Sequence, residues 1–327
     1  KELFATLRTF AAEGRSVVFI SHKLNEVMEI SDRVVVLARG KVVAERKTSE
    51  TSEKELANLM VGHELTKQPY SPSRKTGAPL LQVSGLTVKN DKGVVAVKDL
   101  SLTLHAGEIT ALAGVSGNGQ KELAEVLFGF REPLQGSVMI GDQPLPFASP
   151  KAAIESGIGR IPEDRMTTGL ILDLTVEENL ALENHTKFKK GWTIDYRALR
   201  RHAEKLIEDF SIKTAGPGAI ARTLSGGNLQ KIILARVLSA SPRIIVAAQP
   251  TRGLDVGAAE YVHRRILEAR DAGSAVLLIS EDLDEIFMLS DRIAVMFEGV
   301  IMGMVGRREA SIEQISLWMS GVKEKCA

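Results

Sequence analysis

A short apolar run is followed by three glycines in the segment AGVSGNGQKEL, residues 113–123. Gly114, four residues and Gly119 fit the first part of G-x-x-x-x-G-K-[ST], in which backbone N–H groups converge on a phosphate at the start of a helix. Gln120 stands where this motif has lysine, and Lys121 stands where it has Ser or Thr. The segment therefore predicts either a phosphate cradle that lacks the charge-neutralising and magnesium-binding side chains, or a plain strand-to-helix turn.

Lys121 does not replace the missing lysine. A displacement by one residue on a helix turns a side chain by about 100°, so its ammonium group is expected to point away from a bound phosphate. If the segment is a cradle, its candidate nucleotide contacts are Gly114, Gly117, Asn118, Gly119, Gln120, Lys121 and Glu122.

A second small-residue motif, LSGGN, occupies residues 224–228 at the start of a segment with helical apolar spacing. Two glycines after a serine at a helix N-terminus let backbone amides approach a phosphate closely, which makes Ser225, Gly226, Gly227 and Asn228 candidate nucleotide contacts. The alternative is an ordinary helix cap by Ser225.

An internal repeat defines how the chain is organised. Residues 17–42 and 276–301 align without a gap at an offset of 259, and ten of the 26 positions are identical. The same offset pairs Ser52 with Ser311 and Met60 with Met319. Residues 1–62 are therefore predicted to be the C-terminal remnant of a first domain, of which residues 80–327 form a second copy.

Residues 63–79, between the two copies, are polar with prolines and basic residues, which indicates a linker. The chain starts with Lys1 in the middle of an amphipathic pattern, so we expect a fragment whose first domain begins upstream.

The second copy alternates strand and helix patterns. Residues 80–89 and 93–104 alternate apolar and polar side chains, whereas residues 243–248 and 275–280 are continuous apolar runs typical of buried parallel strands. Helical spacing follows both glycine motifs. This order predicts an α/β fold with helices around a parallel sheet.

Composition excludes several classes of protein. The net charge of +1 over 327 residues gives no general attraction for nucleic acid or anionic lipid. The one cysteine, Cys326, rules out a disulfide framework and favours a cytosolic location, and near the terminus it is not expected to be a nucleophile. No run of about 18 apolar residues predicts a membrane span, and no signal peptide is expected.

The LSGGN motif resembles LSGGQ, the signature of the ABC-transporter ATPases. The resemblance implies an ABC-type P-loop NTPase fold with a parallel sheet core, an antiparallel β subdomain and a helical subdomain. In this family each ATP site joins the phosphate loop of one domain to the signature of the other. Ser225, Gly226 and Gly227 would then complete the first domain's site, which would bind most of the ATP and Mg²⁺, and no metal ligand is predicted in this chain.

The second copy departs from the family pattern at its other catalytic positions. The segment PRIIVAAQPTRGLDVGA has Ala248 and Gln249 where the family has Asp-Glu, although the D-loop Asp255 remains. Alanine cannot bind magnesium and glutamine is a poor base. Glu281 replaces the switch histidine, whereas the first copy retains it as His22, the catalytic candidate.

In the Q-loop region, IPEDR places Glu163 where the family has glutamine, so Glu163 is also a candidate contact. The whole pattern looks most like the ATP-binding subunits of bacterial importers for nucleosides, with ribose and galactose importers as the nearest alternative. It implies integral-membrane permease subunits as partners, indirectly a solute-binding protein, no nucleic acid, and a peripheral position on the cytoplasmic face of the membrane.

In that family ATP closes two domains, hydrolysis at the competent site reopens them, and the Q-loop face drives the permease. The full-length parent is therefore expected to be an ATPase and the fragment alone to be inactive. Two other classes stay open: a soluble tandem ABC protein acting on ribosomes or DNA, and a structural or regulatory module that binds no nucleotide.

Overall fold

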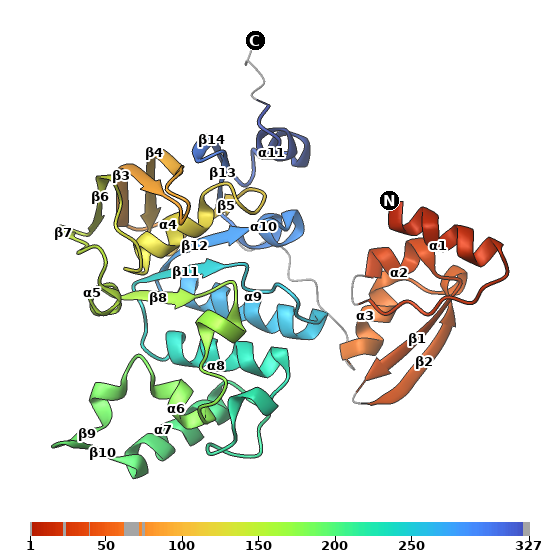
Figure 1. Ribbon diagram of the computed structural model, residues 1–327, viewed down its shortest axis with the longest axis horizontal. Helices are drawn as coiled ribbons and strands as arrows, with labels where there is room; N and C mark the ends of the chain where they lie inside the picture. The colour runs from red at the N-terminus through yellow and green to blue at the C-terminus, as the bar shows by residue number, and fades with distance from the viewer. Residues whose placement is uncertain (1, 22–23, 39, 62–71, 74–75, 323–327) are drawn as a thin grey trace. The chain divides into compact units, whose positions relative to one another are not determined.

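The computed structural model describes residues 2–21, 24–38, 40–61, 72–73 and 76–322. The chain forms two compact units, drawn in Figure 1: a smaller one of residues 1–68 with 254–261, and a larger one of residues 69–253 with 262–327. Most of the linker predicted at residues 63–79 lies outside the described residues.

The smaller unit has a two-stranded sheet with helices and a small apolar core. Val27, Val36 and Leu56 are its buried residues. Its elements are α1 (Glu2–Ala12), α2 (Leu24–Ile30), β1 (Arg33–Ala38), β2 (Lys41–Lys47), the 3-10 helix η1 (Thr48–Glu50) and α3 (Glu53–Val61).

A six-stranded sheet forms the centre of the larger unit. Five of its strands are parallel and the edge strand β14 is antiparallel to β13. The strands β5 and β12 are buried along their whole length, as continuous apolar runs predict. Across the sheet the order is β14 (Val300–Gly306), β13 (Arg292–Phe297), β5 (Ile109–Ala113), β12 (Ala275–Ser280), β11 (Ile244–Ala248) and β8 (Ile158–Ile161).

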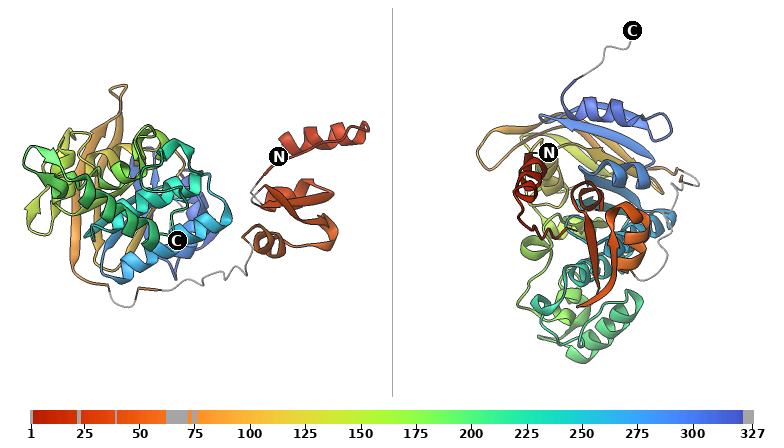
Figure 2. Two further views of the ribbon diagram at one scale, coloured as in Figure 1. Left: turned by 90° about the horizontal axis from the view of Figure 1, so that it is seen from below. Right: turned by 90° about the vertical axis from the view of Figure 1, so that its right-hand side faces the viewer.

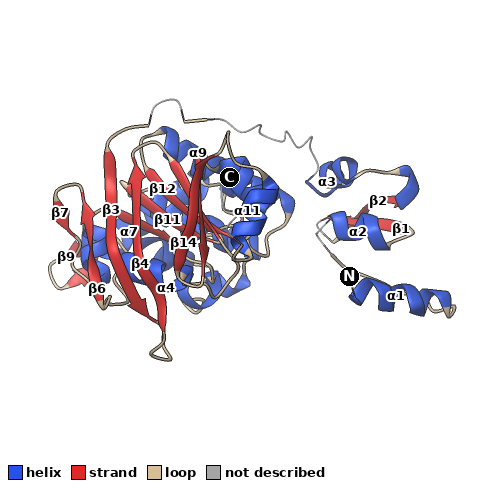
Figure 3. Ribbon diagram, turned by 90° about the horizontal axis from the view of Figure 1, so that it is seen from above, coloured by secondary structure: helices blue, strands red, loops and turns tan. Residues whose placement is uncertain are grey.

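A second, antiparallel sheet packs with the first around the main core, and Figure 3 shows its strands in red at one side of the larger unit. Leu81 and Leu104 from this sheet share the core with Leu123 of α4 (Gln120–Leu127) and Val246 of β11. Its strands are β4 (Val95–His105), β3 (Pro79–Lys89), β6 (Gln135–Ile140) and β7 (Gln143–Pro144).

Helices complete the larger unit, and Figure 2 shows it from two further sides. The buried guanidinium group of Arg236 in α8 donates to the carbonyl of Gly169 at 2.8 Å and pairs with Glu183 at 3.1 Å, which ties the helical layer together. The helices are α4 (Gln120–Leu127), α5 (Pro150–Glu155), α6 (Val176–Ala181), α7 (Tyr196–Asp209), α8 (Gly226–Leu238), α9 (Val256–Asp271, of which residues 262–271 belong to this unit), α10 (Leu283–Leu289) and α11 (Ile312–Met319).

Shorter elements join these helices: the π-helical turn η2 (Arg165–Gly169), the 3-10 helices η3 (His185–Phe188) and η4 (Ala221–Thr223), and the hairpin β9 (Lys189–Lys190) with β10 (Thr193–Ile194). The predicted architecture of a parallel core, an antiparallel subdomain and a helical subdomain is confirmed.

The sequence repeat is also a repeat of structure within each unit. The starts of α2, β1, β2 and α3 recur in α10, β13, β14 and α11 at the same offset of 259 residues. Even the irregularity in strand pairing recurs, between Val36 and Leu37 in one hairpin and between Val295 and Met296 in the other.

One side-chain contact recurs with the repeat. The Ser21 hydroxyl donates to a carboxylate oxygen of Glu26 at 3.0 Å, and the Ser280 hydroxyl donates to Glu285 at 2.6 Å. Both serines stand at the end of the repeated apolar run, so the same hydrogen bond joins that run to the following helix in both copies.

Candidate functional site

The glycine loop joins the buried end of β5 to the start of α4. Gly117 and Gly119 have φ of 94° and 106°, a backbone conformation that favours glycine. A Cβ atom at Gly119 would lie 2.3 Å from the carbonyl oxygen of Ala96, so a side chain there has no space. The loop therefore has the tight backbone that its glycine spacing predicts.

The side chain of Gln120 fills the inside of this loop. Its Oε1 accepts a hydrogen bond from the backbone N–H of Asn118 at 3.1 Å, and its Nε2 donates to the carbonyl of Val115 at 3.2 Å. A Cβ built at Gly114 would lie 2.4 Å from that Nε2, and Gln120 is only 5% exposed. An amide that a phosphate would use is thus already paired within the chain.

Asn118 attaches the same loop to the turn between β13 and β14. Its side chain donates to Val115 at 3.0 Å and accepts from the backbone N–H of Glu298 at 2.8 Å. The N–H of Gly299 donates to the Asn118 carbonyl at 3.0 Å. These hydrogen bonds fix the loop against the turn between β13 and β14.

A carboxylate stands next to the loop at the position where the first copy has histidine. The Ser116 hydroxyl donates to Glu281 at 3.3 Å. The two residues meet because β5 and β12 are neighbouring parallel strands, with Ala113 opposite Ser280, so both chains leave the sheet at the same edge. A negative charge at this place repels a phosphate.

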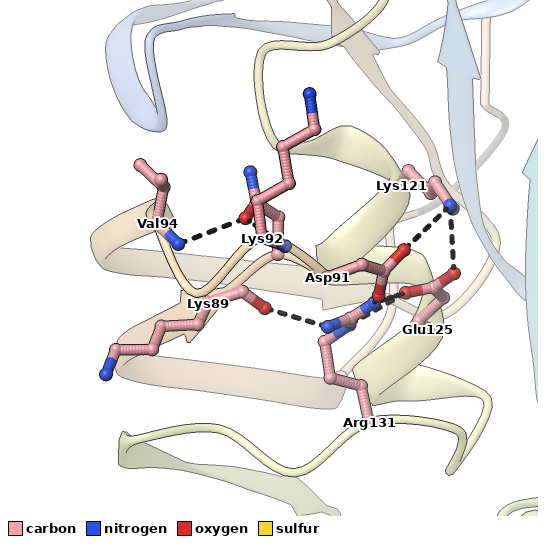
Figure 4. A network of polar contacts seen from close by, with 8 residues as sticks. Lys89, Asp91, Lys92, Val94, Lys121, Glu125 and Arg131 are labelled. Carbon is pink, nitrogen blue, oxygen red and sulfur yellow. Dashed lines mark hydrogen bonds and ion pairs between the residues drawn. The ribbon is translucent and has the colours of Figure 1, made fainter.

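Lys121 points away from the loop, as its displaced position predicts. Its side chain is 63% exposed, and its ammonium group lies 3.6 Å from Glu125 and 3.7 Å from Asp91. Figure 4 shows how Arg131 joins these two carboxylates. The hydrogen bond from Arg131 is the main cause of the lowered pKa of Asp91. The same hydrogen bond raises the pKa of Arg131. Glu122 lies in the first turn of α4.

The end of β11 provides neither a metal ligand nor a carboxylate base. Ala248 is buried, and Gln249 adopts a left-handed φ of 45° while its N–H donates to the carbonyl of Ile279 at 2.8 Å. In the part of the chain that the structure describes, no group of three or more His, Cys, Asp or Glu could bind a metal ion.

These contacts decide whether a magnesium–nucleotide fits the loop of the larger unit. Gln120 occupies the cradle, Glu281 places a negative charge beside it, and Ala248 offers no oxygen. The residues present therefore do not fit a phosphate with its magnesium ion at this loop.

The LSGGN motif has the opposite character. Ser225 is exposed and extended, with φ −68° and ψ 156°, and α8 begins at Gly226. The first amides of a helix have no intrahelical partner, so the N–H groups of Gly226 and Gly227 point out of the helix end. Asn228 braces the motif, because its side chain donates to Ser225 Oγ at 2.9 Å and accepts from the N–H of Lys213 at 2.9 Å.

Glu163 forms an ion pair with Arg252, which links the IPEDR segment to the segment after β11. A second contact joins the same two segments, because the guanidinium of Arg165 donates to the carbonyls of Arg252 at 2.7 Å and Gly253 at 3.1 Å. Neither Arg165 nor Arg252 was among the predicted site residues. Both lie within motifs quoted above, but only the structure shows that they join two segments 87 residues apart in the sequence.

A cavity of about 580 Å³ lies beside Glu163. It extends to Lys121 and Ala248, the two positions where the phosphate-loop motif and its partner strand would place magnesium ligands. Arg160 lines it with its guanidinium 4.9 Å from the ring centre of Phe130, and burial lowers the pKa of Arg160.

Comparison with known proteins shows which family these features resemble. The profile of the ABC transporter family matches residues 97–252, which include the glycine loop, IPEDR, LSGGN and the end of β11. Residues 97–252 are thus similar in sequence to the ABC transporter family.

Curated relatives match nearly the whole chain. The nucleoside import ATP-binding protein NupA of Lactococcus lactis is 39% identical over 98% of this chain and 64% of its own length. The guanosine import ATP-binding protein NupO of Bacillus subtilis is 42% identical over 99% and 64%. The ribose import ATP-binding protein RbsA of Clostridium tetani is 39% identical over 96% and 62%. The chain thus spans less than two thirds of these relatives.

Solved structures show the same fold. A nucleotide-free ATP-binding cassette from an ABC transporter superposes with a TM-score of 0.62 at 22% identity, covering 76% of this chain and all of the cassette. This agrees with the predicted ABC-type P-loop fold.

Two further predicted site residues are Asp255 and His22. The D-loop residue Asp255 is exposed, and its side chain accepts from the N–H of Ala258 at 2.8 Å, so it caps the start of α9. His22, the predicted switch histidine of the first copy, lies outside the described residues.

The larger unit also contains a buried carboxylate that the sequence motifs did not reveal. Glu285 accepts hydrogen bonds from Thr251 at 2.7 Å, Ser280 at 2.6 Å and His263 at 3.0 Å. Burial acts to raise the pKa of Glu285, but the contacts with these three partners outweigh it and lower the pKa. The sequence signal that could have identified Glu285 is the glutamate at the matching repeat position, Glu26.

No helix in the described part of the chain has the length and apolar character needed to cross a membrane.

Proposed function

We propose that this chain is part of an ATP-binding subunit that energises import of a small solute, and that its second domain completes an ATP site formed with another ABC domain. In this arrangement the amides of Gly226 and Gly227, with Ser225, contact the nucleotide phosphates of that other domain's loop. His22 acts at the same site, where the Mg²⁺ ion is also bound.

One contrast supports this assignment of roles. The phosphate loop of the second domain is filled by Gln120, whereas the amides of Gly226 and Gly227 lie in the first turn of α8 and have no helical partner. A domain with an obstructed loop and an open signature is suited to complete a neighbour's site and not to turn over ATP itself. The fragment alone is accordingly inactive.

We further propose that residues 1–62 are the C-terminal remnant of that other domain, residues 63–79 the linker and residues 80–327 the second domain. Val18 and Ile20 are 90% and 91% exposed, while Leu277 and Ile279 at the matching repeat positions are buried in β12. Such apolar side chains are expected to be covered by further strands of a first domain.

The transported solute is proposed to be a nucleoside, because two relatives are named for nucleoside and guanosine import. Ribose- or glucose-type sugar import is the alternative, since relatives of comparable identity carry those names. Cells that lack the full-length protein can be compared with cells in which its gene has been restored. The labelled compound, guanosine or ribose, whose uptake recovers on restoration identifies the solute. The partners are a membrane permease and, through it, a solute-binding protein, with this subunit at the cytoplasmic face.

ATP hydrolysis by the full-length protein tests the division of roles. The His22→Ala variant is expected to lose nearly all activity, and Glu281→Ala to keep most of it, because Glu281 stands beside the filled loop. Equal loss in both variants would contradict the proposal. Copurification with an integral-membrane permease separates an importer from a soluble ABC protein acting on ribosomes or DNA, and binding of a fluorescent ATP analogue separates it from a module that binds no nucleotide.

A further inference from the structure

The β9–β10 hairpin carries an unusual concentration of positive charge. Residues 185–201, HTKFKKGWTIDYRALRR, contain three Lys in and before the hairpin and three Arg in α7 against one Asp, although the whole chain has a net charge of only +1. Of these cations, Arg200 is paired with Glu177 at 2.9 Å. The rest of the chain is therefore net acidic. Figure 1 shows this hairpin at the end of the larger unit opposite the antiparallel sheet of β3 and β4.

Apolar and aromatic side chains stand exposed among these charges. Trp192, at the tip of the hairpin, is fully exposed at 105% of its reference area, and Tyr196 is 63% exposed. Ile194 lies between them in sequence and is 38% exposed. Large apolar side chains grouped in this way on a surface mark an interaction site.

The hairpin is a fixed element of the fold. The ring of Phe188 is buried with Leu199 and lies 5.2 Å from the ring of His202. The N–H of Asp195 donates to the Phe188 carbonyl at 2.8 Å, and the Asp195 carboxylate caps α7 by accepting from the N–H of Arg197 at 3.0 Å. The tip is thus presented from a packed base.

The lysines of the hairpin are available to an outside partner. Within the described residues, Lys187, Lys189 and Lys190 have no carboxylate oxygen within ion-pairing distance, and all three are exposed. An anionic surface is the partner that this charge distribution favours.

We propose that residues 187–196, the basic and aromatic segment that contains the β9–β10 hairpin, dock on the anionic surface of a lipid bilayer. Tryptophan and tyrosine with neighbouring lysines are the side chains that settle at the boundary between lipid headgroups and hydrocarbon. Lysines near an anionic bilayer are attracted to its surface, and the attraction falls off within a Debye length. A nucleic-acid surface is disfavoured because the exposed lysines of this segment stand among protruding apolar side chains, and because Arg200 of the following helix is already paired with Glu177.

Vesicle binding by the whole chain tests this proposal. We expect the protein to cosediment with vesicles of equimolar phosphatidylcholine and phosphatidylglycerol, and not with vesicles of phosphatidylcholine alone. In a Trp318→Phe background, Trp192 becomes the only tryptophan, and its fluorescence should shift to shorter wavelength when the anionic vesicles are added. Binding should weaken as salt is raised.

A variant with reversed charge at the hairpin tests whether its lysines bind the vesicles. Lys189→Glu with Lys190→Glu should reduce affinity for the anionic vesicles by roughly tenfold or more, since each lysine contributes to the surface attraction. The matched control is Lys89→Glu with Lys92→Glu, two exposed lysines near the turn of the β3–β4 hairpin, which should bind like the wild type.

Absence of binding, equal binding to both vesicle types, or equal loss in the control variant would overturn the proposal. An acidic protein as the true partner would give the first of these outcomes. The result does not depend on the ATPase assay of His22→Ala, so failure of either proposal can be recognised separately.

Discussion

The backbone N–H of Asn118 donates a hydrogen bond to the side-chain oxygen of Gln120, 3.1 Å away, inside the loop that joins β5 to α4. Because the partner is the residue that replaces the motif lysine, one substitution both removes a positive charge and occupies the cradle. The loop keeps the backbone shape of a phosphate site, but its polar groups form hydrogen bonds with one another.

Replacement of Gln120 is expected to open this loop. Gln120→Lys would free the Asn118 amide and restore a cation, and should raise the affinity for a fluorescent ATP analogue by roughly tenfold or more, since hydrogen bonds to charged groups are about twice as strong as neutral ones. Gln143→Ala, an exposed glutamine in β7, is the control. Unchanged nucleotide binding in Gln120→Lys would show that the side chain does not obstruct the site.

Gly226→Asp is expected to abolish ATP hydrolysis by the full-length protein without unfolding the domain. The new carboxylate would stand at the helix end that faces a phosphate, while the nearest atom to a Cβ there is a flexible Arg165 nitrogen at 3.5 Å. Gly218→Asp introduces the same charge in a similarly open place, 3.7 Å from an Arg200 nitrogen, and should retain activity. Equal activity of the two variants would argue against a role for the motif.

Gly119→Ala should destabilise the larger unit more than Gly117→Ala does. Both glycines have positive φ, so each alanine costs about 1–2 kcal/mol of backbone strain. Only at Gly119 does the new Cβ meet a backbone carbonyl, at 2.3 Å, whereas Gly117 faces open space. Urea unfolding followed by tryptophan fluorescence measures the difference, and equal destabilisation of both variants would contradict the tight contact.

Glu285 is expected to make stability depend on acid pH. The pKa of Glu285 is lowered in the folded state, so the unfolded state binds the proton more readily. The contribution of Glu285 to the free energy of unfolding is therefore complete above the ordinary carboxyl pKa. It is lost as the pH falls through the lowered pKa of the folded state. Unfolding free energies of wild type and Glu285→Gln should therefore differ most at neutral pH and converge in acid. Glu281→Gln, at an exposed carboxylate, should follow the wild type; a constant gap for Glu285→Gln would refute this origin.

Local sequence patterns were sufficient for most of the fold. Continuous apolar runs identified β11 and β12, and glycine spacing located the loop before α4. The hairpin at residues 189–194 was not predicted, because two-residue strands carry no periodicity to recognise. Its lysines and Trp192 were therefore not grouped before the structure placed them on one tip.

The sequence by itself determined the motifs and the positions at which their side chains differ from the family pattern, because residue types at fixed spacing are local information. The tertiary structure decided what the replacements do. Gln120 turns back into its own loop, Glu281 reaches Ser116 only because β5 and β12 are adjacent, and Glu163 meets Arg252 across two strand ends. Such contacts depend on the order of strands in the sheet, which a single sequence does not contain.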